Sequence, residues 1–176
     1  MYLTANNLRH CTAGDTRRFA QKTMDKMHLQ FGTPRHGWME IQLSSPDRKI
    51  MLNVSDVPCD SLYSLVKVLT KLLEGSTEEV VEWSLEPEYA AWTFKRKDNE
   101  IELSVSCPVG STPVLIFQCE AVNMIQRISE SLRELGADPV WKEDDASSRI
   151  WSWDFPNILL ELLVQKLTNA ESSGQR

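Results

Sequence analysis

Apolar and polar residues alternate along two neighbouring segments, 38–44 and 49–55. In WMEIQLS every second residue is apolar, and KIMLNVS repeats the pattern after the polar turn SPDR. Alternation with a period of two places the apolar side chains on one face of a strand. The two segments therefore predict a β-hairpin with one buried face.

A helical period follows in CDSLYSLVKVLTKLLEG, residues 59–75. Its leucines and valines recur at spacings of three and four residues, which places them on one helical face. Asp60 or Ser61 is placed to cap the start of this helix, and Gly75 can adopt the left-handed conformation at its end.

Four further segments predict strands: 78–85, 88–96, 100–107 and 114–119. The last of them, VLIFQC, is apolar throughout, which predicts a more central strand. Residues 120–136 and 156–167 carry the spacing of two more helices, and Gly136 stops the first of these. This order predicts an α+β fold, an antiparallel sheet of about five to six strands with two to three helices packed on one face.

The organisation predicted is one α+β domain over residues 38–168. Residues 1–37 lack a strong period and form a basic N-terminal arm or short helix, which Asp15 could cap over about 16–29. Residues 169–176 are expected to be a disordered tail.

Charge is unevenly distributed between these parts. Residues 1–37 hold six Lys or Arg against two acidic residues, whereas residues 38–176 hold thirteen against twenty-three. An acidic body repels a phosphate backbone and favours a basic partner, so we expect no nucleic-acid binding. The alternative is that the negative charge only keeps the protein soluble.

Location follows from what the chain lacks. No apolar run approaches the roughly 18 residues of a membrane span, and the N-terminal residues lack the apolar stretch of a signal peptide. We therefore expect a cytoplasmic protein that binds no membrane. The cysteines lack metal-site spacing and are expected to be free thiols: Cys11, Cys59, Cys107 and Cys119.

Motifs for known chemistry are absent from the sequence. All histidines lie within residues 1–37, and the glycines form no phosphate-binding loop, so we expect a non-catalytic protein without a cofactor or a metal. Two acidic pairs leave a metal-dependent enzyme as an alternative, Glu86 with Glu88 and Asp144 with Asp145, although a solvated acidic turn is the commoner explanation.

An aromatic cluster, RIWSWDFP, occupies residues 149–156. Alternation places Trp151 and Trp153 on one face of an extended segment, with Ile150 on the other, and Phe155 packs inward at the start of the last helix. The tryptophans are either a lid over the core or anchors for a partner. Together with the preceding acidic loop they give the candidate partner-binding residues: Glu143, Asp144, Asp145, Trp151, Trp153 and Asp154.

Three stretches carry a resemblance: HGWMEIQL at 36–43, VSDVPCDSLYSLVKVLTKLLEG at 54–75 and VVEWSLEPEYAAWTFKR at 80–96. They resemble a loose group of uncharacterised small bacterial α+β proteins, some of which look like immunity proteins of polymorphic or contact-dependent toxin systems. The resemblance covers roughly residues 36–106 and concerns structural motifs. It implies a protein that binds and neutralises one cognate toxin domain, which would be basic.

The function expected from the sequence is therefore that of an immunity protein, with an oligomeric state that the sequence leaves open. The alternative is an intracellular structural or regulatory interaction module that self-associates or acts as an adaptor.

Overall fold

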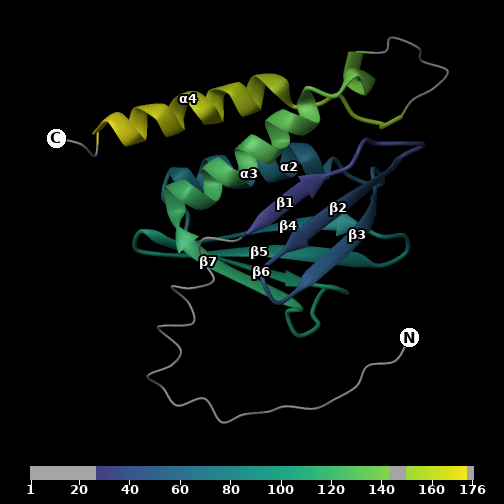
Figure 1. Cartoon of the computed structure of the whole chain (residues 1–176), viewed down its shortest axis with the longest axis horizontal. Helices are drawn as coiled ribbons and strands as arrows, with labels where there is room; N and C mark the ends of the chain where they lie inside the picture. Colours follow the sequence, from purple (N-terminus) through teal and green to yellow (C-terminus); the bar gives the residue numbers. More distant parts are fainter. Residues whose placement is uncertain (1–26, 143–149, 174–176) are drawn as a thin grey trace.

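The protein is an α+β domain with one antiparallel sheet and its helices on one face of that sheet (Figure 1). The computed structural model describes residues 27–142 and 150–173. The strands lie in the order of the chain: β1 (His28–Phe31), β2 (Trp38–Ser44), β3 (Lys49–Ser55), β4 (Glu78–Ser84), β5 (Tyr89–Lys97), β6 (Glu100–Ser106) and β7 (Leu115–Glu120). The helices are α2 (Ser61–Leu73), α3 (Ala121–Gly136) and α4 (Asn157–Ser173), with a short 3-10 helix, η2 (Pro139–Lys142).

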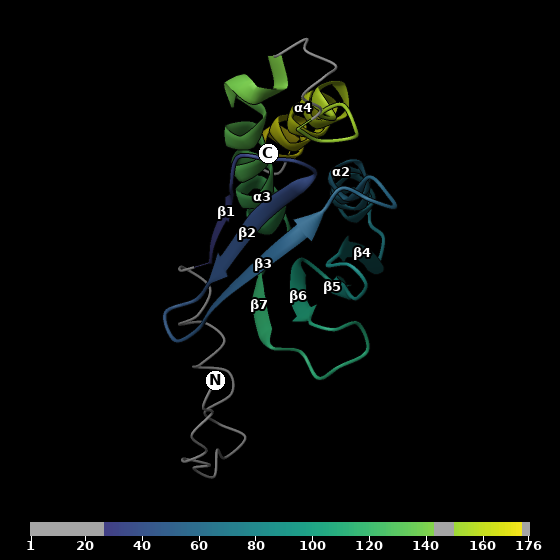
Figure 2. The same cartoon turned by 90° about the vertical axis from the view of Figure 1, so that its right-hand side faces the viewer.

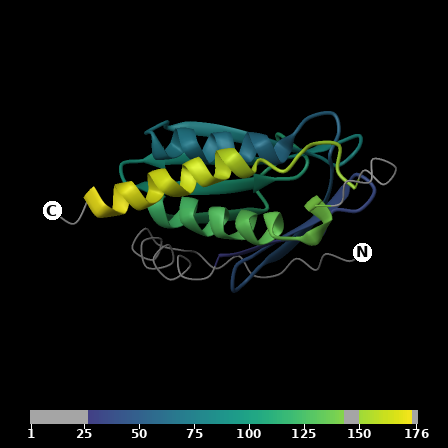
Figure 3. The ribbon, with the colours of Figure 1, turned by 90° about the horizontal axis from the view of Figure 1, so that it is seen from above.

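The helices form two layers above the sheet. Helices α2 and α3 pack on the strands, and α4 packs on both of these helices (Figure 3). The leucine-rich sequence of α4 fits this position, because Leu160, Leu163 and Leu167 are buried against its neighbours. The expected α+β class, with helices on one face of an antiparallel sheet, is confirmed, but the sheet of the described residues has seven strands, where about five to six were expected.

Strand β1 was missed by the sequence pattern. Leu29 pairs with Leu43 and Phe31 with Ile41, and all of these side chains are buried. The sheet thus begins at His28, and the expected boundary at residue 38 is wrong. A four-residue segment is too short to show a period, and pairing with β2 stabilises it. Most of the helix expected over about 16–29 lies outside the described residues, but its last two residues are in this strand.

The sheet bends between β3 and β4. These strands share a single register pair, Ser55 with Ser84, whereas the other neighbours pair along most of their length. Strands β1–β3 consequently run at an angle to β4–β7 (Figure 2). The guanidinium of Arg48, in the β2–β3 turn, donates a hydrogen bond of 3.1 Å to the carbonyl of Val114, so this turn reaches the start of β7.

Strand β7 is an edge strand, so the expectation of a central strand for VLIFQC is wrong. Leu115, Phe117 and Cys119 are buried, but Ile116 points to the other face and is 51% exposed. An apolar run can mark a strand buried on both faces, but here one of its side chains lies on an open surface.

The core lies between the sheet and the helices. Trp83 and Trp92 are fully buried there, with ring centroids 5.1 Å apart, and Phe31 packs on Trp83 at 6.3 Å. Burying a side chain of this size contributes about 4–6 kcal/mol before the entropy cost of ordering it. These rings join β1, β4 and β5 into one core across the bend.

Helix α2 begins and ends at the expected residues. The Asp60 carboxylate accepts a hydrogen bond of 2.9 Å from the N–H of Tyr63, which makes Asp60 the N-cap. Burial raises the pKa of Asp60 and outweighs the N–H groups of Leu62 and Tyr63, which act to lower it. Gly75 has a φ of 104° and donates its N–H to the carbonyl of Leu72, as a left-handed helix end requires.

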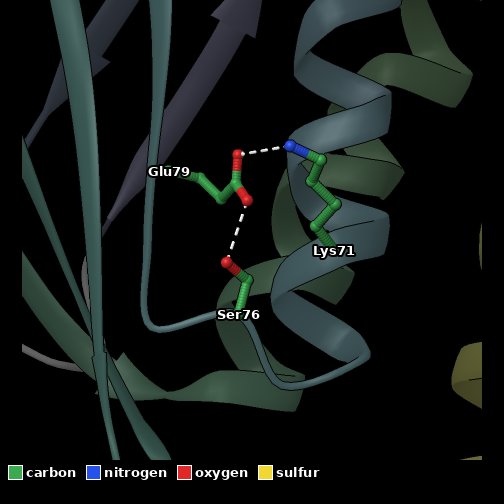
Figure 4. A network of polar contacts seen from close by, with 3 residues as sticks. All are labelled: Lys71, Ser76 and Glu79. Carbon is green, nitrogen blue, oxygen red and sulfur yellow. Dashed lines mark hydrogen bonds and ion pairs between the residues drawn. The ribbon is translucent and has the colours of Figure 1, made fainter.

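A polar network holds the end of α2 against the start of β4 (Figure 4). The Lys71 ammonium lies 3.0 Å from one oxygen of Glu79, and the Ser76 hydroxyl donates to the other oxygen at 2.8 Å. Burial acts to raise the pKa of Glu79, but the hydrogen bonds from Lys71 and Ser76 and the charge of Lys71 together hold it below its ordinary value.

Helix α4 extends beyond the expected end of the domain. It runs to Ser173, so the residues 169–173 that were expected to be disordered are helical, and residues 174–176 lie outside the described part. In residues 27–142 and 150–173, none of the helices combines the length and the apolar character needed to cross a bilayer.

Candidate functional site

The aromatic segment that follows residue 149 is held by Asp56, at the end of β3. The buried carboxylate of Asp56 accepts a hydrogen bond from the N–H of Ser152, and its carbonyl accepts one of 2.6 Å from the indole N–H of Trp153. Gly37 completes the attachment, since its N–H donates to the carbonyl of Ile150 at 2.9 Å and its carbonyl accepts from the N–H of Asp56. The residue just before β2 and the residue just after β3 thus fix residues 150–153, which lie about a hundred positions later in the chain.

Gly37 is required at this position for a steric reason. Its φ is +80°, and a Cβ there would lie 3.1 Å from a carboxylate oxygen of Asp56. Both the backbone conformation and the close approach favour glycine.

The two tryptophans have different environments. Trp151 is 6% exposed and belongs to the core, whereas Trp153 is 40% exposed with its indole N–H bound to Asp56. The expectation that they share one face is wrong, because the segment is a series of bends and its residues do not alternate as in a strand. Trp151 forms the lid over the core, and Trp153 has the exposure of a partner anchor.

Phe155 packs inward, as expected. Its ring lies against Gly136 and has its centroid 5.1 Å from that of Trp141 in η2. Ile150, also expected inside, is half-buried. The aromatic cluster therefore closes the space between α3, η2 and the start of α4.

The residues predicted to bind a partner do not form one exposed surface. Trp153 and Asp154 are exposed, and Trp151 is buried and cannot contact a partner without local opening. Glu143, Asp144 and Asp145 lie outside the described residues.

One exposed residue, Val57, joins this surface from another loop. It directly follows Asp56, whose carbonyl binds Trp153, and its side chain is exposed. We refer to Val57, Trp153 and Asp154 as the Trp153 surface. Sequence reasoning missed both Asp56 and Val57, because one buried acid between a strand and a helix has no pattern that marks it.

Asp138 supplies a further charge at the same end of the molecule. Its carboxylate accepts a hydrogen bond of 2.5 Å from the Thr33 hydroxyl and one from the N–H of Val140. These bonds, with the nearby charge of Arg35, lower the pKa of Asp138 despite some burial. The β1–β2 loop is thereby tied to the end of α3.

One member of the acidic pair considered as a metal site, Glu86, has a structural partner. The Ser55 hydroxyl donates a hydrogen bond to the Glu86 carboxylate, which ties the β4–β5 turn to β3. Over the ranges 27–142 and 150–173, no group of three or more His, Cys, Asp or Glu side chains is arranged to hold a metal. Asp144 and Asp145 fall outside these ranges.

The cysteines of the described part are free, as expected. Cys59 is exposed, Cys107 is half-buried and Cys119 is buried. Burial raises the pKa of the Cys119 thiol to about 11, so it is protonated and unreactive at neutral pH. Cys11 is not among the described residues.

Comparison with known proteins found no family model, no curated protein and no solved structure that matches the chain. The function must therefore be argued from the site itself.

Proposed function

We propose that this protein is a non-catalytic, cytoplasmic immunity protein that binds and neutralises a cognate bacterial toxin domain, and that the Trp153 surface contacts the toxin. The observation that supports this proposal best is the state of Trp153. A large aromatic side chain is exposed to solvent while a hydrogen bond of 2.6 Å holds its indole in place.

A fixed aromatic side chain favours binding for an entropic reason. Ordering a rotamer-rich side chain at an interface costs about 0.5–1.5 kcal/mol, and a ring that is already held avoids most of this cost. Tryptophan is among the residues most often found to dominate interface energies. Asp154, next to it, adds the charge that attracts a basic partner.

The charge of the whole chain fits the same proposal. Its formal net charge is −6, which would speed association with a basic toxin domain and keep nucleic acid away. A cytoplasmic location, where thiols stay reduced, belongs to the proposal as well.

The test is to co-express the protein with the toxin domain expected to be encoded next to its gene, and to measure the affinity of the purified pair. We expect a one-to-one complex. Trp153→Ala should weaken it by about thirtyfold or more, the effect of losing a dominant aromatic contact. Trp151 is unsuitable for this test, because changing a buried tryptophan would destabilise the fold.

Two further variants make the result specific. Trp153→Phe keeps a ring but loses the indole N–H, and should have an intermediate effect, while Leu162→Ala removes an exposed apolar side chain of α4 and should change affinity less than about twofold. Unchanged affinity in folded Trp153→Ala would exclude this site. Failure of the neighbouring toxin domain to bind the wild-type chain would exclude the function.

The alternative function, a self-associating interaction module, has one observation in its favour. Ile158 and Leu162 lie one turn apart on α4 and are 78% and 49% exposed. Two apolar side chains on an outer helix face are a possible contact for a second copy.

A further inference from the structure

The outer face of strands β4–β7 carries none of the described helices, all of which lie on the opposite face (Figure 1). Its central row follows from the register: Val80 pairs with Thr93, Thr93 with Ser104, and Ser104 with Ile116. The residues in the middle of this row have short side chains, and the apolar residues at its two ends are exposed. The middle of this face is therefore shallow, and an exposed apolar side chain stands at each side of it.

A hollow of about 540 Å³ lies at one end of this face. We call it the Glu82 hollow; its lining residues are Glu82, Glu88, Tyr89, Pro108 and Val109. Glu82 pairs with Ala91, and Tyr89 with Ser84, on the outer side of the sheet. The N–H of Val109 donates to the carbonyl of Tyr89 at 2.7 Å, which holds the β6–β7 loop at the rim.

The two carboxylates of the Glu82 hollow are uncompensated. Both glutamates are exposed, and neither carboxylate forms an ion pair or a hydrogen bond within the described part of the chain. By contrast, three other glutamates are each paired with a lysine: Glu78 on the same outer face, Glu79 on the helix-covered face of the sheet and Glu74 at the end of α2. A hollow with two unpaired carboxylates attracts a cation.

The surrounding face has the same sign of charge. Its cross-strand rows hold more carboxylates than ammonium groups. The lysines are Lys95 and Lys97, and the glutamates beside them are Glu78, Glu100, Glu102 and Glu120. Such a face repels the phosphates of nucleic acid and favours a positively charged protein surface.

We propose that the outer face of β4–β7 docks a basic segment of the partner protein, and that the Glu82 hollow receives an arginine or lysine side chain from it. The carboxylates bind the cationic group, and the ring of Tyr89 offers a π face to it. The exposed apolar side chains of Val80, Val109 and Ile116 contact the aliphatic parts of the same segment. The inference rests on the proposed function in that the basic partner is the toxin domain.

The first test is independent of the toxin. An acetylated tri-arginine peptide is titrated into the isotope-labelled protein, and backbone amide shifts are followed by NMR. We expect shift changes centred on Tyr89 and Val109 that disappear in the Glu82→Gln/Glu88→Gln variant. The control, Glu134→Gln/Glu161→Gln, changes the charge by the same amount at exposed positions on α3 and α4 and should leave the changes intact. Shifts spread evenly over the surface, or shifts that persist in Glu82→Gln/Glu88→Gln, would overturn the proposal.

The second test uses the complex with the toxin domain. Glu82→Gln/Glu88→Gln should weaken binding by about tenfold, mainly through a slower association rate with a smaller salt dependence. The control double variant should lose less than about threefold. Loss of affinity in Trp153→Ala with none in Glu82→Gln/Glu88→Gln would overturn the inference and leave the proposed function standing. Peptide binding at the hollow without any toxin complex would support the cation site and exclude the proposed function.

Discussion

Gly136 lies at the last position of α3, where the absence of a side chain is a packing requirement. A Cβ at this position would lie 2.5 Å from Cε1 of Phe155 and 3.0 Å from its Cζ. The sequence correctly predicts that the helix ends at Gly136. The reason for glycine here is packing and not a left-handed backbone, because Gly136 lies within the helix and has no positive φ. Its function is to let the Phe155 ring approach the backbone.

Gly136→Ala should therefore destabilise the protein by about 1–3 kcal/mol, the usual cost of overpacking a filled site. Urea denaturation of the variant measures this cost. In a Phe155→Ala background the same change should be neutral, or stabilising by up to about 1 kcal/mol, because the ring is gone and alanine has the higher helix propensity. Equal costs in both backgrounds would show that the ring is not the cause.

Trp153 illustrates what residue patterns leave open. The sequence shows two tryptophans separated by one residue, and alternation treats them as equivalent. Their difference arises because Asp56, almost a hundred positions earlier, binds Ser152 and Trp153 and bends the segment. A distant acceptor of this kind cannot be inferred from local periodicity.

At the scale of elements, the contact between α2 and β4 depends on a titrating group. The folded-state pKa of Glu79 lies below its ordinary value of 4.5 because Lys71 and Ser76 bind its carboxylate. A carboxyl with a lowered pKa contributes stability above its unfolded pKa, and this contribution is lost as pH falls through the folded pKa.

Glu79→Gln should thus lower the free energy of unfolding by about 0.5–1 kcal/mol at pH 7, since Lys71 is largely exposed and the pair is screened by solvent. The difference from wild type should shrink as pH falls below about 4.5, where the wild-type carboxyl also becomes neutral. Urea unfolding midpoints of both proteins, measured between pH 3 and pH 7 in steps of about one pH unit, test this convergence. A gap that stays constant across this range would assign the effect to something other than the charge of Glu79.

The elements themselves were predicted unevenly. Helix α2 and the β2–β3 hairpin follow from strong periods, and both are present with the expected ends. Strand β1 was missed, and β7 was assigned to the wrong position in the sheet. The four residues of β1 are too few to show a period of two. The apolar run of β7 does not reveal whether the strand has one neighbouring strand or two.

At the scale of the whole molecule, the exposed pair on α4 raises the question of oligomeric state. Ile158 and Leu162 together offer far less than the roughly 800 Å² per partner that stable interfaces bury. We therefore expect a monomer at micromolar concentration in sedimentation experiments on the isolated chain. A dimer that Leu162→Lys converts to a monomer would contradict this expectation and favour the self-associating alternative.

Local periodicity was enough to predict the α+β class, the main helix and most strands, because each of these depends on the side chains of neighbouring residues. The composition likewise predicted an acidic body. Tertiary contacts decided which tryptophan is buried, where the sheet bends and which acids remain unpaired. These features depend on residues far apart in the chain, such as Asp56 with Trp153 and Tyr89 with Val109, and their contacts form only when the chain folds.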